Sequence, residues 1–191
     1  MSDTPTFPNW FEGQRYNFEE QLTRFKGKPD LRFLQIGAYT GDASVWLCEN
    51  VLTDYTSQLI DVDTWEGSIE KEHDSIDFVS VLEYYEERIA PFRKVLRLKM
   101  TSEQYFSGNN EVMFDFIYID GDHTEAVVYQ DATSAWELLK SGGIIAFDDY
   151  QWGQDVHPSL RPKLAIDRFM SEHEGEYEVL VNSYQMWLLK K

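Results

Sequence analysis

Two short segments of the chain each end an apolar, strand-like run in acidic residues. In "IYIDGDHTE" Asp120 and Asp122 directly follow the apolar run, with His123 after them, and in "IIAFDDY" the adjacent Asp148 and Asp149 do so. Carboxylates brought close together repel one another, so that some of them protonate unless a cation lies between them. Oxygen ligands at this density suit Mg²⁺, or Mn²⁺ as a looser fit. We therefore expect a divalent metal site if the fold brings the two segments together.

A parallel sheet is the architecture that would do so. Five nearly continuous apolar runs indicate buried strands, and segments with apolar residues at helical spacing alternate with them. The runs are "LRFLQIG", "SQLIDVD", "KVLRLKM", "FDFIYID" and "GGIIAFDD", the last after a Gly-Gly break. Such alternation predicts an α/β fold whose doubly wound, mostly parallel sheet has helices on both faces. In open sheets of this kind ligands bind outside the carboxyl ends of the strands, where both acidic segments lie.

The two ends of the chain carry further elements. At the start, "NFEEQLTRF" has apolar residues at helical spacing, with Asn17 placed to cap the helix and Glu20 three residues on. At the end, "YEVLVNSYQMWLLK" indicates two strands joined by a tight turn at Asn182-Ser183. This hairpin should add one antiparallel strand to the sheet.

The bulk composition indicates one domain, at residues 17–191, after an aperiodic extension at 1–16 that is either a loose terminus or a flap over a site. The formal charge of −17 repels phosphate backbones and anionic headgroups, so neither nucleic acid nor membrane is an expected partner. A single cysteine, Cys48, and the lack of a signal peptide or a membrane-spanning apolar run indicate a cytoplasmic protein. Assembly into a homo-oligomer is left open.

The turn after the first strand suits a nucleoside-bearing cofactor. In "GAYTG", Gly37 and Gly41 allow a sharp turn and a close approach to a ligand, and an acidic residue of Asp61-Val62-Asp63, at the end of the second strand, can hold both hydroxyls of a ribose. Tyr39 departs from the G-x-G-x-x-G fingerprint of dinucleotide sites, and the loop is poor in glycine for a pyrophosphate cradle. A nucleoside without phosphates fits better, and S-adenosylmethionine is the common one.

Taken together, "LRFLQIGAYTGDASVWL", "LIDVDTWEG", "FDFIYIDGDHTEAVVYQDATSAWELLKSGGIIAFDDY" and "YQMWLLK" resemble the class I S-adenosylmethionine-dependent methyltransferases. The most similar branch contains the metal-dependent catechol O-methyltransferases and the sugar O-methyltransferases of antibiotic biosynthesis. The resemblance implies a Rossmann-like, seven-stranded sheet with an antiparallel last strand.

The resemblance also implies which residues contact the cofactor. Gly37 and Gly41 would lie under its methionine part, Asp63 at its ribose, Thr101 and Ser102 near its adenine, and Asp120 beside it. Gln35 is a departure, because the family usually has an acid there that contacts the ammonium group of the cofactor. An amide oxygen accepts the same hydrogen bond without charge assistance.

The same resemblance assigns Asp120, Asp148 and Asp149 as ligands of Mg²⁺ or Mn²⁺, with Asp149 where the family often has Asn. The implied reaction is O-methylation of a small-molecule acceptor, either a sugar moiety or a catechol-like vicinal diol. A metal that holds two neighbouring hydroxyls lowers the pKa of one, a nearby base takes its proton, and the oxyanion attacks the sulfonium methyl. Asp120 is the first choice for this base, doubling as a ligand, and His123 is the second.

Most of these residues also have a plainer structural interpretation. His123 could be a loop histidine bonded to backbone, Asp122 a turn-forming acid, and the Asp148-Asp149 pair a cap or a turn. Cys48 is expected in the core rather than as a nucleophile. Three tryptophans fall in loops near the expected cleft, where their rings would suit a sugar or a planar acceptor: Trp10, Trp65 and Trp152.

Three rival functions use the same motifs. Asp120, Asp122 and Thr124 fit the D-x-D-x-T motif of Mg-dependent phosphatases of the haloacid dehalogenase type, with "IIAFDD" as the later acidic motif. Those enzymes need a Ser/Thr strand and a lysine between the two motifs, whereas one helix fills that interval here. A metal-dependent glycosyltransferase is a weaker option in a chain this short. A non-catalytic protein that keeps the cofactor fold is a further alternative, favoured by Gln35.

Overall fold

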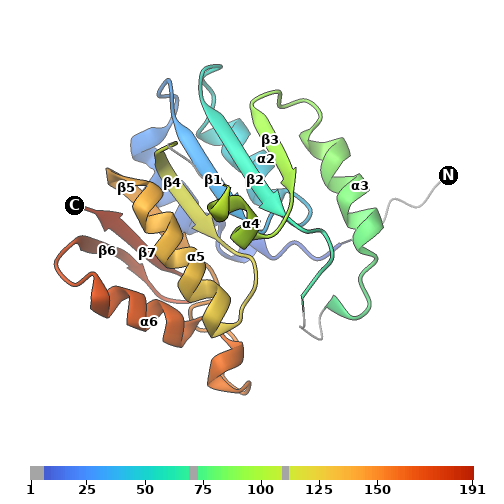
Figure 1. Cartoon of the computed structure of the whole chain (residues 1–191). Helices are drawn as coiled ribbons and strands as arrows, with labels where there is room; N and C mark the ends of the chain where they lie inside the picture. Colours follow the sequence, from blue (N-terminus) through green and yellow to red (C-terminus); the bar gives the residue numbers. More distant parts are fainter. Residues whose placement is uncertain (1–6, 69–72, 109–111) are drawn as a thin grey trace.

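Seven strands form one mixed sheet in the computed structural model (Figure 1), which describes residues 7–68, 73–108 and 112–191. Their order is β3-β2-β1-β4-β5-β7-β6. The strands are β1 (Arg32–Ile36), β2 (Gln58–Asp63), β3 (Val95–Lys99), β4 (Phe114–Ile119), β5 (Leu139–Phe147), β6 (Tyr177–Asn182) and β7 (Met186–Lys190). Pairs from β3 to β5 are parallel, whereas β7 runs antiparallel to both β5 and β6. The predicted sheet, including its single antiparallel strand, is confirmed.

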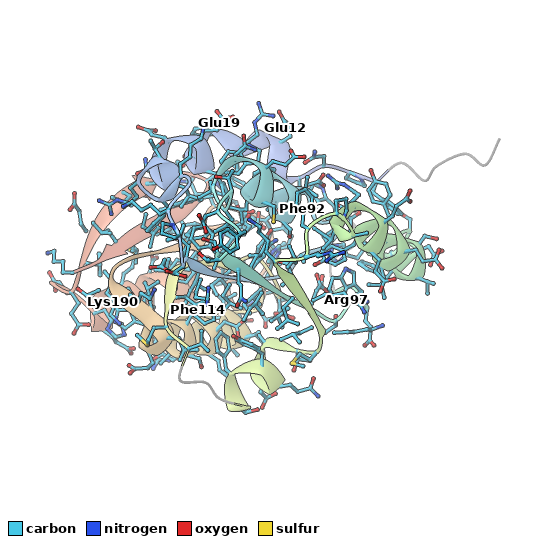
Figure 2. All side chains as sticks on the ribbon, turned by 90° about the horizontal axis from the view of Figure 1, so that it is seen from above. Glu12, Glu19, Phe92, Arg97, Phe114 and Lys190 are labelled. Atoms are coloured by element: carbon cyan, nitrogen blue, oxygen red, sulfur yellow. The ribbon has the colours of Figure 1, made fainter. Side chains whose placement is uncertain are left out.

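Helices cover both faces of this sheet, as the alternation of elements predicts. The helices are η1 (Phe11–Gly13), α1 (Arg15–Gln21), η2 (Leu22–Phe25), α2 (Asp42–Asn50), α3 (Phe78–Ile89), α4 (Ser102–Ser107), α5 (Glu125–Leu138), η4 (Pro158–Leu160) and α6 (Lys163–Glu172). Side chains of α1, η2 and α2, Cys48 among them, pack on one face, and those of α4, α5 and α6 pack on the other. Figure 1 shows how these helices lie around the sheet. Figure 2 shows the side chains that fill the space between these layers. None of the helices in the described part of the chain is long and apolar enough to cross a membrane.

Three local expectations were wrong. Asn17 lies inside α1 rather than at its cap, is 2% exposed, and donates from Nδ2 to Gln185 Oε1 at 2.8 Å. The predicted Gly-Gly break lies within β5, which begins at Leu139 and shifts register against β4 there. The final turn spans 183–185 instead of Asn182-Ser183, because the Ser183 N–H bonds to the Gln185 carbonyl at 3.0 Å.

Helix α4 was not predicted at all. Its start carries a capping box, in which the Thr101 hydroxyl accepts from the Gln104 N–H and the Gln104 side chain accepts from the Thr101 N–H. The capping box satisfies backbone donors that would otherwise be unpaired. A short helix therefore follows β3 and fixes Thr101 and Ser102 at the carboxyl end of the sheet.

One acid is buried within the sheet. Asp61 on β2 is fully buried next to Gln35 on β1, and its Oδ2 accepts a hydrogen bond from the Tyr85 hydroxyl at 2.7 Å. Burial raises the pKa of Asp61 to about 6, although the hydroxyls of Tyr85 and Ser44 act in the opposite direction. The folded chain therefore holds this proton more tightly than the unfolded chain does.

This burial predicts how stability depends on pH. Because the pKa of Asp61 is higher in the folded state, its contribution to stability is lost as the pH rises through about 6. Between about pH 5 and about pH 7.5 the wild type should lose roughly 1–2 kcal/mol of unfolding free energy that Asp61→Asn retains. Urea unfolding at the two pH values measures this, with Asp74→Asn as an exposed control. Equal pH slopes in wild type and Asp61→Asn would show that the buried acid is not protonated as expected.

Candidate functional site

A cavity of about 700 Å³ opens at the carboxyl ends of the parallel strands. Its lining comes from the ends of β1, β2, β4 and β5, from the start of α4, and from the N-terminal segment. Of the residues predicted for the site, the following line it: Gly37, Asp63, Thr101, Ser102, Asp120, His123, Asp148 and Asp149. The structure thus brings the glycine turn and the two acidic segments to one cavity.

Two glycines shape the turn between β1 and α2. Gly37 has φ +84°, and a Cβ there would lie 1.8 Å from the carbonyl oxygen of Asp120. Gly41 has φ +76°, and a Cβ there would lie 2.8 Å from the ring of Tyr85. Left-handed backbone of this kind favours glycine, and neither position has room for a side chain. Gly41 is not among the described residues that line the cavity, so its role is to shape the turn.

Asp63 holds this turn in place from the end of β2. Its Oδ2 accepts from the N–H groups of Ala38 at 2.7 Å and Tyr39 at 2.9 Å, and its Oδ1 accepts from that of Trp65 at 2.7 Å. A carboxylate offers about four acceptor sites, so capacity for a ribose hydroxyl remains. Trp65 is 3% exposed and donates from Nε1 to the Tyr39 carbonyl at 2.9 Å. It braces the turn rather than facing a substrate.

Gln35 is not oriented as the resemblance implies. It is 2% exposed, its Nε2 donates to the Gly37 carbonyl at 2.8 Å, and its Oε1 accepts from the Ser44 hydroxyl at 3.3 Å. Both polar atoms of the amide are thus hydrogen-bonded beneath the glycine turn. Gln35 is not among the described residues that line the cavity. A contact between Gln35 and the cofactor's ammonium group does not fit this arrangement.

Asp120, His123 and Asp149 form the cluster that suits a metal ion. One potential ligand atom from each lies within 4.8 Å of the others. His123 Nε2 is 3.0 Å from Asp149 Oδ2, and Asp149 Oδ1 accepts from the Tyr184 hydroxyl at 2.6 Å. Burial, and then the charges of Asp148 and Asp149, raise the pKa of Asp120 well above its ordinary value. A divalent cation would remove this repulsion, so the donor set fits one.

Asp148 stands beside this cluster, with its carboxylate already hydrogen-bonded. It accepts from the Tyr118 hydroxyl at 2.6 Å, from Gln185 Nε2 at 2.9 Å and from the Asp149 N–H at 3.0 Å. Burial, and then the charge of Asp149, raise its pKa to about 6. Sequence reasoning gave His123 only the role of a base, whereas its position next to Asp149 makes it a candidate ligand as well. Nothing in the local sequence signals this pairing.

The N-terminal segment contributes an aromatic wall that sequence reasoning only partly anticipated. The Trp10 ring stacks on the Tyr39 ring with centroids 4.6 Å apart, and both line the cavity. Near the acidic segments, the ring of Trp152 packs against that of His123, with the ring centroids 4.8 Å apart. Gln14, Tyr39 and Tyr184 also line the cavity and were not predicted from the sequence. They come from a helix start, a turn and a hairpin, where no motif marks them.

Comparisons with known proteins identify the domain. The family model of the methyltransferase domain matches residues 34–150. Uncharacterized protein R132 of Acanthamoeba polyphaga mimivirus is 37% identical over 54 residues, which cover 27% of this chain and 24% of that protein. The matched segment is therefore about a quarter of the length of that curated relative.

Solved structures share the fold. The O-methyltransferase TomG from Streptomyces achromogenes, in complex with SAM, has a TM-score of 0.67 at 15% identity and covers 100% of this chain and 84% of its own. The SAH-bound methyltransferase PaMTH1 from Podospora anserina has a TM-score of 0.64 at 17% identity, and the match covers 97% of this chain and 82% of that one. At these identities the likeness establishes the fold, while the family model covers more than half of the chain. The chain therefore belongs to the methyltransferase domain family, with the class I S-adenosylmethionine-dependent fold that its sequence predicts.

Proposed function

We propose that this protein transfers a methyl group from S-adenosylmethionine to a hydroxyl group of a small-molecule acceptor, assisted by a divalent cation. The observation that carries the proposal is the cluster of Asp120, His123 and Asp149 in the cavity whose other wall is the glycine turn. A donor bound over the turn and an acceptor bound at the acids would share that cavity.

Residues of the chain are suited to hold each part of the cofactor, which supplies an electrophilic methyl group on a sulfonium. The turn at Gly37 would support its methionine part, Asp63 its ribose, and Thr101 and Ser102 its adenine. The acids of the cavity also complement the positive charge of a sulfonium.

Asp120, Asp149 and His123 would hold the cation, with Asp148 beside them. Mg²⁺ or Mn²⁺ held there would lower the pKa of an acceptor hydroxyl. Asp120 would take the acceptor proton. His123 Nε2 and Asp149 Oδ2 are 3.0 Å apart, a separation at which both atoms could contact one cation.

The acceptor is proposed to be a sugar moiety or a catechol-like vicinal diol. Trp10, Tyr39 and Trp152 give the cavity rings on which a planar group or the apolar face of a sugar can rest. Because Trp10 comes from the extension at 1–16, of which residues 1–6 lie outside the described residues, we propose that its described part, 7–16, acts as a flap over a methyltransferase domain at 17–191. The charge of −17 disfavours a nucleic-acid acceptor.

The rival functions lose support at particular residues. Asp122 Oδ1 accepts from the Thr124 N–H at 2.6 Å and from the Thr124 hydroxyl, which is the turn-forming role of the plainer structural interpretation. Gln35 is the best support for a non-catalytic binder. It is buried beneath the turn, so the presence of an amide there instead of an acid does not directly weaken the wall of the cavity.

The metal role is tested by binding and by chelation. Asp149→Ala should weaken Mn²⁺ binding, measured by calorimetry, by about 100-fold or more because one ligand is lost. EDTA should abolish methyl transfer to a catechol-type or sugar diol, and added Mg²⁺ should restore it. Asp122→Asn is the matched control and should keep both properties, whereas a phosphatase would lose activity with it. Methyl transfer that survives both EDTA and Asp149→Ala would contradict the proposal.

The identity of the base is tested at saturating metal. Asp120→Asn should lower kcat by about 10²–10⁴-fold, because the amide cannot accept the acceptor proton. His123→Gln should lower metal affinity while changing kcat by less than about tenfold. Both variants need metal affinity and kcat measured separately. A larger loss of kcat in His123→Gln than in Asp120→Asn would assign the base to the histidine.

A further inference from the structure

We infer that Gln14, the residue directly before α1, binds the amino-acid end of the cofactor, the part that Gln35 does not reach. This inference rests on the proposed binding of S-adenosylmethionine. It assigns a cofactor contact to the N-terminal segment, outside the matched residues 34–150.

The side chains beneath the glycine turn do not reach the amino-acid end of the cofactor, which therefore needs another partner. The amide of Gln35 bonds to the Gly37 carbonyl and to the Ser44 hydroxyl, and the neighbouring Asp61 is fully buried against Tyr85. Neither side chain is among the described residues that line the cavity. Neither of these two side chains, on β1 and β2, can therefore bind the ammonium or the carboxylate of the cofactor.

Gln14 has the polar group that this place lacks. It stands at the N-cap position of α1, yet within the described chain its side chain makes no capping hydrogen bond. It lines the cavity, and its Oε1 is buried without a hydrogen-bond partner among residues 7–68, 73–108 and 112–191. Buried polar atoms are almost always paired, and an unpaired one costs stability. A ligand group in the cavity would supply the missing partner.

Packing holds Gln14 near the methionine side of the cavity. Four residues earlier, Trp10 stacks on Tyr39 of the glycine turn. Phe11 packs against Phe18 at 4.9 Å and against Trp46 of α2 at 6.0 Å. The start of α1 is thereby fixed beside the turn and the helix that follows it.

The adenine side lies elsewhere. Thr101 and Ser102 belong to the start of α4, and α4 packs on the face of the sheet opposite α1. The Tyr39 hydroxyl is a second buried atom without a partner in the described residues, and Tyr39, in the glycine turn, also lines the cavity. Two cavity-lining residues thus carry polar groups that a bound aminocarboxylate could pair.

An amide is chemically suited to that group. Its oxygen can accept from the ammonium and its nitrogen can donate to the carboxylate, so either orientation of the Gln14 amide forms a charge-assisted hydrogen bond. Loss of one such bond should weaken binding by about tenfold to a hundredfold.

Calorimetry with two nucleosides tests the assignment. S-adenosylhomocysteine carries the amino-acid end, whereas methylthioadenosine lacks it and keeps the adenosine. Gln14→Leu should weaken binding of S-adenosylhomocysteine by about tenfold to a hundredfold and leave binding of methylthioadenosine unchanged. Retained methylthioadenosine binding also shows that the variant is folded. Gln21→Leu, the same change at the last residue of α1, is the matched control and should change neither affinity.

Each contrary outcome is distinct. Unchanged affinity of Gln14→Leu for S-adenosylhomocysteine, or an equal loss for both ligands, would overturn the role of Gln14 and leave the proposed function standing. A wild-type protein that binds neither nucleoside would overturn the proposed function, and this inference with it.

Discussion

The backbone of Gly37 lies directly against that of Asp120, and this contact joins the two sides of the cavity. A Cβ on Gly37 would stand 1.8 Å from the Asp120 carbonyl oxygen, and the Asp120 N–H donates to the Ile36 carbonyl at 2.8 Å. The turn suited to a methyl donor and the acid suited to a metal are thus held at a fixed separation with no side chain between them. Any larger residue at position 37 would push them apart, so the alignment needed for methyl transfer depends on backbone packing.

The acids are held from the opposite direction by a buried polar network. Gln185 donates from Nε2 to Asp148, and its Oε1 accepts from Asn17 Nδ2 and from Trp187 Nε1, each at 2.8 Å. Tyr118 donates to the other oxygen of Asp148. The N-terminal helix and the closing hairpin therefore fix an acid that neither contains. Both lie outside the segment that the family model matches, so the site is complete only with these flanking elements.

What the sequence predicts well is what depends on local pattern. Continuous apolar runs indicated the strands of the parallel sheet, and the rule for their carboxyl ends brought Asp120, Asp148 and Asp149 together. What it missed depends on distant partners. Asn17 resembles a helix cap until Gln185, 168 residues away, is placed beside it.

The position of a residue in a motif likewise does not predict where its side chain points. Gln35 occupies the expected place in the first turn, yet Ser44 and the Gly37 carbonyl draw its amide away from the cavity. Helix α4 is different, because the "TSEQ" capping box was a readable signal.

Position along one strand separates acids that support the fold from acids that can do chemistry. Asp61 and Asp63 are two residues apart on β2, so their side chains leave the same face of the sheet. Tyr85 of α3 covers Asp61, which is sealed beneath the turn with its pKa raised by burial. Asp63 lies one step further, at the end of the strand and only partly buried, where it bonds to the N–H groups of the turn and lines the cavity. Residues of one type thus take different roles because one is covered by a helix side chain and the next lies at the edge of the site.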